Sequence, residues 1–298
     1  MYSQIAANKR KTWLLIAIFT AVVVAVGYAF GQYTGGGYGM LVFAALVSGT
    51  MTLVSYFAGD KIALATSGAK PVTREHSPYL HRLVENLAIA AGMPMPKLYL
   101  IQAPQINAFA TGRDPQHASI AVTTGAIEQL QNEELEGVLA HELSHISNYD
   151  IRLMTVVIVL VGIVTLLSDF FFRLRWYGGS SSDRRSDKGN ANGVLMLVGF
   201  IALILAPIIG KLIQLAISRR REFLADASGS LLTRYPDGLA SALEKIGSTN
   251  QQPMPQAHQA TAHLYISSPF GRAGERISRM FSTHPPLAER IKALREMA

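Results

Sequence analysis

The chain has 298 residues, of which 49% are hydrophobic and 16% charged, and its formal net charge is +7. It contains no cysteine, which excludes disulfide bonds and a cysteine nucleophile. The positive charge suits contact with anionic lipid head groups, but no nucleic-acid-binding or phosphate-binding motif accompanies it, so we expect neither a nucleic-acid nor a nucleotide partner.

Two long apolar runs come first in the chain, Trp13–Phe30 and Tyr38–Phe57. Neither holds a charge, and each is long enough to span a bilayer. A cleavable signal peptide is an alternative for the first run, because residues 9–11 before it are basic. The second run follows so closely that a membrane hairpin fits better. The basic residues then predict a cytoplasmic N-terminal end.

The segment after the hairpin is predicted to be soluble and to contain one helix and two short strands. Pro78–Ala91 has the pattern of a helix, with Ser77 as its cap and Gly92 as its stop. Lys97–Gln102 and Ser119–Thr123 are rich in strand-forming residues. The predicted fold class is therefore mainly α with a small β-sheet, joined to integral-membrane helices.

A pair of histidines marks the predicted helix Asn132–Tyr149. His141 and His145 are four residues apart, so their imidazoles lie on one face and can bind one tetrahedral Zn²⁺ per chain. Glu142 is placed to act as general base toward water, and this arrangement is typical of zinc metalloproteases. Asp150 comes nine residues after His141, on the far side of a continuous helix, so we do not expect it to bind the metal.

Two more apolar runs follow, Leu153–Phe172 and Val194–Ile209. A paired crossing would return the chain to the side of the membrane that holds the histidines, and this is the favoured prediction. The Arg173–Gly193 loop between them has five basic and two acidic residues, which favours a cytoplasmic position. A hairpin that does not fully cross is therefore the alternative.

A third metal ligand must come from later in the chain. Glu222 and Asp226 are four residues apart and share a helix face. Glu222 could bind the metal, while Asp226 could accept the N–H of a ligand histidine. Surface ion pairs between these acids and the basic residues 219–221 are an equally open interpretation.

Four motifs together resemble the HtpX membrane proteases, which are bacterial relatives of the CAAX prenyl endopeptidases. They are His141-Glu-x-x-His145, Glu222-x-x-x-Asp226, Asn107-Ala-Phe-Ala-Thr-Gly112 and Ser282-Thr-His-Pro-Pro286. The resemblance implies a gluzincin-like zinc metalloprotease domain. In that family the residues matching His141, His145 and Glu222 bind zinc, and the residue matching Glu142 is the base.

The resemblance also implies roles outside the metal ligands. His284 would line the active site and stabilise an oxyanion, although it could instead orient the helix that carries Glu222. Asn107, Ala108 and Phe109 are candidates for a substrate platform near an edge strand that pairs with extended chains. The alternative for the Asn107 motif is a simple turn.

These observations predict a membrane-bound zinc endopeptidase. By resemblance, its substrates are damaged, misfolded or unfolded membrane proteins, and it is a multi-pass protein of the inner (cytoplasmic) membrane with its active site facing the cytoplasm. A non-catalytic metal-binding scaffold and a processing protease of prenylated proteins are the alternatives. The predicted segments are a hairpin at 1–58, a protease part at 59–150, a second hairpin at 151–217 and a second protease part at 218–298.

Overall fold

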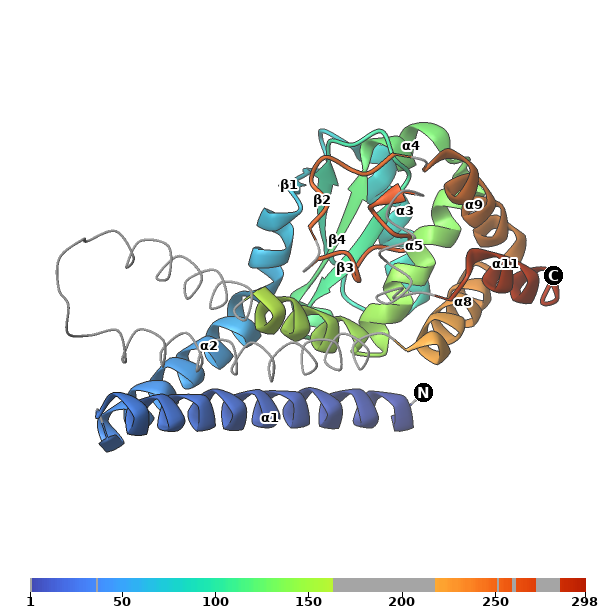
Figure 1. The fold of residues 1–298 in the computed structure, drawn as a ribbon. Helices are drawn as coiled ribbons and strands as arrows, with labels where there is room; N and C mark the ends of the chain where they lie inside the picture. Colours follow the sequence, from blue (N-terminus) through green and yellow to red (C-terminus); the bar gives the residue numbers. More distant parts are fainter. Residues whose placement is uncertain (1, 36, 163–217, 251, 259–260, 272–284) are drawn as a thin grey trace.

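The computed structural model describes residues 2–35, 37–162, 218–250, 252–258, 261–271 and 285–298. A long helical hairpin and a compact domain make up this part of the chain (Figure 1). The second half of the third apolar segment (residues 163–172), all of the fourth and His284 lie outside the described residues. Their predicted arrangement therefore stays a prediction.

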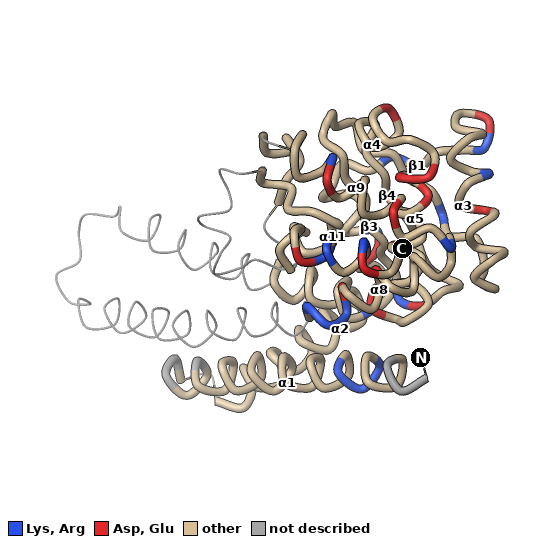
Figure 2. Tube along the Cα trace, turned by 90° about the vertical axis from the view of Figure 1, so that its right-hand side faces the viewer, with Lys and Arg blue, Asp and Glu red and all other residues tan. Residues whose placement is uncertain are grey.

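Helices α1 (Tyr2–Thr34) and α2 (Gly37–Thr66) form the hairpin. Each contains a stretch that is long and apolar enough to cross a membrane, Ile5–Ala29 in α1 and the whole of α2, in agreement with the two predicted spans. The charges of α1 are confined to its N-terminal end, whereas charged residues are spread over the compact domain (Figure 2). The helices pack closely at Gly27, where an added Cβ would overlap Ala44.

The sheet has four strands in the order β1-β2-β4-β3. Their bounds are Lys70–Pro71 for β1, Lys97–Ile101 for β2, Ala108–Gly112 for β3 and Ala118–Thr123 for β4. β2 and β4 are parallel, while β1 pairs with β2 and β3 with β4 in antiparallel fashion. The two predicted strands correspond to β2 and β4.

Strand β3 was not predicted, and it changes the interpretation of the Asn107 motif. Its Ala-Phe-Ala-Thr-Gly sequence has little intrinsic strand propensity. Pairing with β4 and packing against the histidine helix override that weakness. Residues 108–112 of the motif therefore form an edge strand of the sheet and not a turn, and the predicted strand Lys97–Gln102 lies inside the sheet.

Helix α5 (Asn132–Ser147) is the central element of the domain and carries both histidines. It packs against β3 and against α3, α8 and α9. The helices around the sheet and α5 are α3 (Pro78–Ala90), η1 (Pro115–His117), α4 (Thr124–Gln129), α8 (Arg219–Thr233), α9 (Pro236–Thr249) and α11 (Leu287–Arg295). The mainly α fold with a small sheet is confirmed.

The chain turns sharply where α5 ends. Tyr149 has a left-handed backbone conformation with φ of 59°, which a helix cannot continue through. The next helix, Asp150–Gly162, leaves at 82° to α5. By composition this bent pair is a third candidate span, but α5 is buried in the core of the compact domain.

Candidate metal centre

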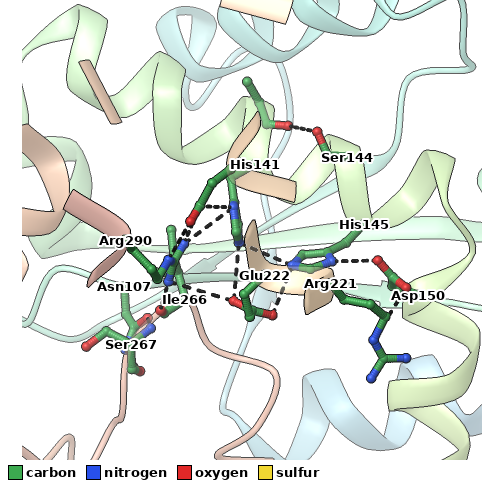
Figure 3. Close-up of polar contacts among 12 residues, drawn as sticks. Asn107, His141, Ser144, His145, Asp150, Arg221, Glu222, Ile266, Ser267 and Arg290 are labelled. Atoms are coloured by element: carbon green, nitrogen blue, oxygen red, sulfur yellow. Dashed lines mark hydrogen bonds and ion pairs between the residues drawn. The ribbon is translucent and has the colours of Figure 1, made fainter. Parts of the chain in front are cut away.

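The two histidines of α5 point into the same buried site (Figure 3). His141 is 1% exposed and His145 is 4% exposed. Their Nε2 atoms are 3.2 Å apart, and their rings meet edge to face. The spacing of four residues on a helix produces this proximity, because such residues lie one turn apart on one face.

Helix α8 brings Glu222 against the histidines. Its carboxylate oxygens lie 3.8 Å from His141 Nε2 and 3.6 Å from His145 Nε2, and one donor atom from each of the three residues lies within 4.8 Å of the others. The close approach depends on Gly229, where a Cβ would come 2.9 Å from the backbone nitrogen of His141. Glu222 is 4% exposed, so it is not a surface acid.

Asp226, one turn after Glu222, contacts the Nδ1 side of the His141 ring. Its Oδ1 lies 2.9 Å from His141 Nδ1, while Arg290 of α11 donates to Oδ2 from Nε (2.8 Å) and to Oδ1 from Nη2 (2.6 Å). Burial opposes ionisation of Asp226, but the Arg290 charge outweighs it and lowers the pKa of Asp226 to about 2. Burial also lowers the pKa of His141 to about 4.

Asp150 holds His145 in the same way. Its Oδ2 accepts a hydrogen bond of 3.0 Å from His145 Nδ1. The expectation that Asp150 lies on the far side of the helix was wrong, because the chain turns at Tyr149 and carries Asp150 back. Burial favours neutral His145, but the hydrogen bond to Asp150 and the charge of Glu222 raise its pKa to about 9.

The other oxygen of Asp150 is held by the membrane hairpin. Asn8 of α1 donates a hydrogen bond of 2.7 Å from Nδ2 to Asp150 Oδ1. Arg221 lies further from the same oxygen, with its Nε at 3.8 Å. Thus α1 reaches the group that orients His145.

Glu142 lies between the histidines on α5 and is 1% exposed. The backbone N–H of Ala110 in β3 donates to its carboxylate. Its Oε2 is buried and has no hydrogen-bond partner among the described residues. Burial, assisted by the nearby charge of Glu222, raises the pKa of Glu142 to about 7.

The donor set fits a divalent metal ion. Both Nδ1 atoms face carboxylates, so both Nε2 atoms are turned toward Glu222, where a metal ion could replace any proton they carry. Two nitrogens bound to a tetrahedral Zn²⁺ at about 2.0–2.1 Å are about 3.3 Å apart, which is close to the Nε2 separation of 3.2 Å. The buried, unpartnered oxygen of Glu142 points to a further polar group at the same place.

The predicted platform residues lie next to this site but are engaged within the protein. The Asn107 amide donates to Ser267 O at 3.0 Å. Ala108 O accepts from Ile266 N at 3.0 Å, and Phe109 is buried against Tyr265. These residues therefore join β3 to the segment 265–267 beside the candidate metal centre.

Sequence reasoning did not predict Arg290, Asn8 or Ala110 as parts of the site. None of them stands at a recognisable spacing from the histidines, since they come from α11, α1 and β3. Two signals were present, because Ala110 lies within the Asn107–Gly112 motif and Asp150 is an acidic residue shortly before the apolar run that begins at Leu153. His284 lies outside the described residues, so its place relative to the site stays a prediction.

Known proteins resemble this chain over its full length. The model of peptidase family M48 matches residues 74–298. The protease HtpX homolog of Caldanaerobacter subterraneus subsp. tengcongensis is 48% identical over 297 residues, 100% of this chain and 98% of the relative. The homolog of Streptococcus gordonii is 41% identical over 300 residues and all of both chains. The crystal structure of S. mikatae Ste24p gives a TM-score of 0.49 at 20% identity, over 99% of this chain and 67% of that one.

Proposed function

Because the chain belongs to peptidase family M48 and carries two candidate membrane-spanning helices, we propose that it is a membrane-bound zinc endopeptidase. Its substrates in this proposal are damaged or misfolded membrane proteins, cut at the cytoplasmic face. The observation that carries the proposal is the convergence of donor atoms from His141, His145 and Glu222 within 4.8 Å. The resemblance of the sequence to HtpX proteases, which the relatives confirm, supports the same activity.

The two imidazoles and one carboxylate match the donor set of catalytic zinc sites. His141, His145 and Glu222 would hold one Zn²⁺, which supplies a Lewis acid that polarises the scissile carbonyl and acidifies a water molecule. Asp226 and Asp150 keep the Nε2 atoms of both imidazoles turned toward Glu222.

Glu142 is the proposed general base. The Ala110 N–H fixes its carboxylate, and burial raises its pKa to about 7. A carboxylate at this position can take a proton from water and later give it to the leaving amine. His284 keeps its proposed role of stabilising the oxyanion of the tetrahedral intermediate.

Strand β3 is proposed to guide the substrate into the site. It is one of the two edge strands of the sheet and contacts α5, and an edge strand can recognise extended chains through the backbone. Asn107, Ala108 and Phe109 would contribute by shaping this edge, because their side chains are buried. Recognition of this kind gives broad cleavage, which suits misfolded substrates.

The position of α1 supports a cytoplasmic metal centre. With 33 residues, α1 is about 50 Å long, which exceeds the about 30 Å of a bilayer core. Its basic N-terminal end extends to Asp150 through Asn8, so that end and the metal centre share one side of the membrane. The positive-inside rule favours the cytoplasm for this side.

Cysteine labelling can test this topology, because the chain has no cysteine of its own. Single cysteines replacing the exposed residues Thr73 and Ser248 should react with a membrane-impermeant reagent only from the cytoplasmic side. A cysteine replacing Ser181 should react only from the outside if the third and fourth apolar segments cross the membrane. Labelling of Thr73→Cys from the outside would refute the proposed orientation.

The proposed base is tested by Glu142→Gln in the full-length protein. This variant should lose digestion of an unfolded substrate such as casein while retaining stoichiometric zinc, because the carboxylate is not a ligand. Glu136→Gln is the matched control, since it makes the same change six residues earlier on α5 and should remain active. A chelator should abolish the wild-type activity. Retained activity of Glu142→Gln would refute its role.

The proposed third ligand is tested by Glu222→Ala, which should lose both zinc and activity. Two neutral imidazoles would leave the charge of the ion poorly compensated. Glu244→Ala removes an exposed acid of α9 and should retain both properties. If Glu222→Ala keeps stoichiometric zinc while His284→Ala or Asp150→Ala loses it, the ligand assignment is wrong.

A further inference from the structure

One face of α1 packs against the helix that follows α5. Among its buried residues, Asn8, Thr12, Leu15 and Phe19 recur every three or four positions. Further along the same face, Ile16 and Phe19 pack with Val156 and Leu160. Asn8 is the polar residue at the head of an otherwise largely apolar contact.

The amide of Asn8 is buried and satisfied by the turn that follows α5. Asn8 is 2% exposed, and its Nδ2 donates to Asp150 Oδ1 at 2.7 Å and to Asn148 O at 2.9 Å. Burying an amide is costly unless its hydrogen bonds are made. These two bonds use both N–H hydrogens of the amide. One is donated to the Asn148 carbonyl in the turn and the other to the Asp150 carboxylate.

We propose that Asn8 is a positioning residue for the metal centre. It fixes the carboxylate of Asp150, whose other oxygen holds Nδ1 of His145 at 3.0 Å. Through this chain of hydrogen bonds, α1 sets the direction in which His145 presents Nε2 to the metal ion. The inference rests on the proposed function, in which His145 is a ligand.

In this proposal the hairpin of α1 and α2 contributes to the metal centre as well as to membrane attachment. Residue 8 lies outside the segment 74–298 that matches the peptidase family model, so part of the metal centre is supplied by a region beyond the family domain. Nearby contacts secure the same end of α1, since Lys9 Nζ lies 4.2 Å from the centre of the Tyr149 ring. Arg221 adds charge near Asp150, but at 3.8 Å it does not replace the short amide contact.

The test compares Asn8→Leu with Thr12→Val in the full-length protein in lipid nanodiscs. Thr12 is the matched control because it is equally buried, lies one turn along the same face and bonds only to the backbone of its own helix. Zinc affinity is measured by competition with a chromophoric chelator, on a Glu142→Gln background that prevents self-digestion. Asn8→Leu should bind zinc about tenfold more weakly, as groups behind a metal ligand do. Thr12→Val should match the parent.

Two further readouts separate positioning from general packing. The visible absorption of the Co²⁺-substituted protein reports ligand geometry, so it should change in Asn8→Leu and stay unchanged in Thr12→Val. In an Asp150→Ala background, Asn8→Leu should cost almost nothing further, because Asn8 then has no carboxylate to hold. If Asn8→Leu does not fold, as judged by circular dichroism, Asn8→Ala takes its place in every comparison.

The outcomes distinguish this inference from the proposed function. A parent protein that binds no zinc refutes the proposed function and the inference with it. A parent that binds zinc, with Asn8→Leu equal to it in affinity and Co²⁺ spectrum, overturns the inference alone. An equal loss with and without Asp150 also overturns it, because Asn8 would then act through packing and not through the carboxylate.

Discussion

His141 and His145 lie one turn apart on α5, yet opposite ends of the chain support them. His141 is backed by Asp226 and then by Arg290 of the last helix. His145 is backed by Asp150 and then by Asn8 of the first helix. One carboxylate is therefore held by a charged guanidinium, and the other is held most closely by a neutral amide.

The pKa values of the two histidines are also shifted in opposite directions. Burial, with help from the Arg290 charge, lowers the pKa of His141 to about 4 even though Asp226 opposes the shift. Burial acts on His145 too, but Asp150 and Glu222 outweigh it and raise the pKa to about 9. The comparison teaches that two histidines one turn apart on a helix can differ in basicity through the charges around them, because Arg290 lies near His141 whereas Glu222 and Glu142 add to Asp150 at His145.

The largest effect is expected from replacing Arg290, which supports Asp226 and through it His141. Arg290→Leu leaves Asp226 buried without its countercharge, a loss of about 3–5 kcal/mol, so thermal unfolding should shift strongly downward and zinc should be lost. Arg290→Lys should not restore the protein, because an ammonium cannot make the bidentate contact. Arg295→Leu removes an exposed arginine of the same helix and is the control. Wild-type stability of Arg290→Leu would contradict the expected asymmetry.

The next effect compares the two carboxylates directly. Asp226→Asn and Asp150→Asn should each weaken zinc binding by about 10–100-fold, because each removes the charged partner of a histidine that we propose as a ligand. The loss should be larger for Asp226→Asn, since it also leaves Arg290 buried without its carboxylate. Competition titrations with a chelator give both affinities. A larger loss for Asp150→Asn would reverse the comparison.

A smaller effect is expected from moving α8 without touching its acids. In Gly229→Ala the new Cβ would press on the backbone of α5 near His141, which should cost about 1–3 kcal/mol and weaken zinc binding. Gly247→Ala is the matched control, because the nearest atom there is the end of the Leu287 side chain at 3.4 Å. Unfolding curves and zinc content of both variants decide the outcome. Identical behaviour would show that the α5–α8 contact tolerates the methyl group.

The smallest effect is expected at a third aspartate–histidine pair, on the surface. Asp114 accepts a hydrogen bond of 2.7 Å from the half-exposed His117. Burial alone would raise the pKa of Asp114, but the contacts with His117 outweigh burial and lower it. Its stabilisation is therefore present above the unfolded-state pKa and is lost as the pH falls through the folded-state value.

Asp114→Asn should cost only about 0.2–1 kcal/mol at neutral pH. The difference from wild type should shrink as the pH falls below about 4. Thermal unfolding at several pH values checks both statements. A difference that grows with acidification would contradict the sign of the pKa shift.

Structural features that depend on short intervals in the sequence could be predicted. The four-residue interval of His141 and His145, the interval of Glu222 and Asp226 and the apolar runs of α1 and α2 all translate directly into geometry. Asp150 was misplaced because the reasoning extended α5 as a straight helix, and nothing in the local sequence marks Tyr149 as left-handed. β3 was missed because tertiary pairing overrode its weak propensity.

Asn8 and Arg290 illustrate what spacing cannot provide. Each is an ordinary polar residue until the fold places it behind a particular carboxylate, and each comes from the far end of the sequence. The identity of their partners depends on how α1 and α11 pack, which is a property of the whole tertiary structure. A single sequence does not contain that information in a local pattern.

The use of both chain ends has a consequence for biosynthesis. Chains leave the ribosome N-terminus first, so α1 and α5 are synthesised well before α11 emerges. Until Arg290 arrives, Asp226 has no bidentate cation behind it and the His141 side stays unfinished. A nascent chain would therefore carry its ligand residues without an assembled centre, and the ribosome, its translocon and the growing chain itself would be spared from premature cleavage.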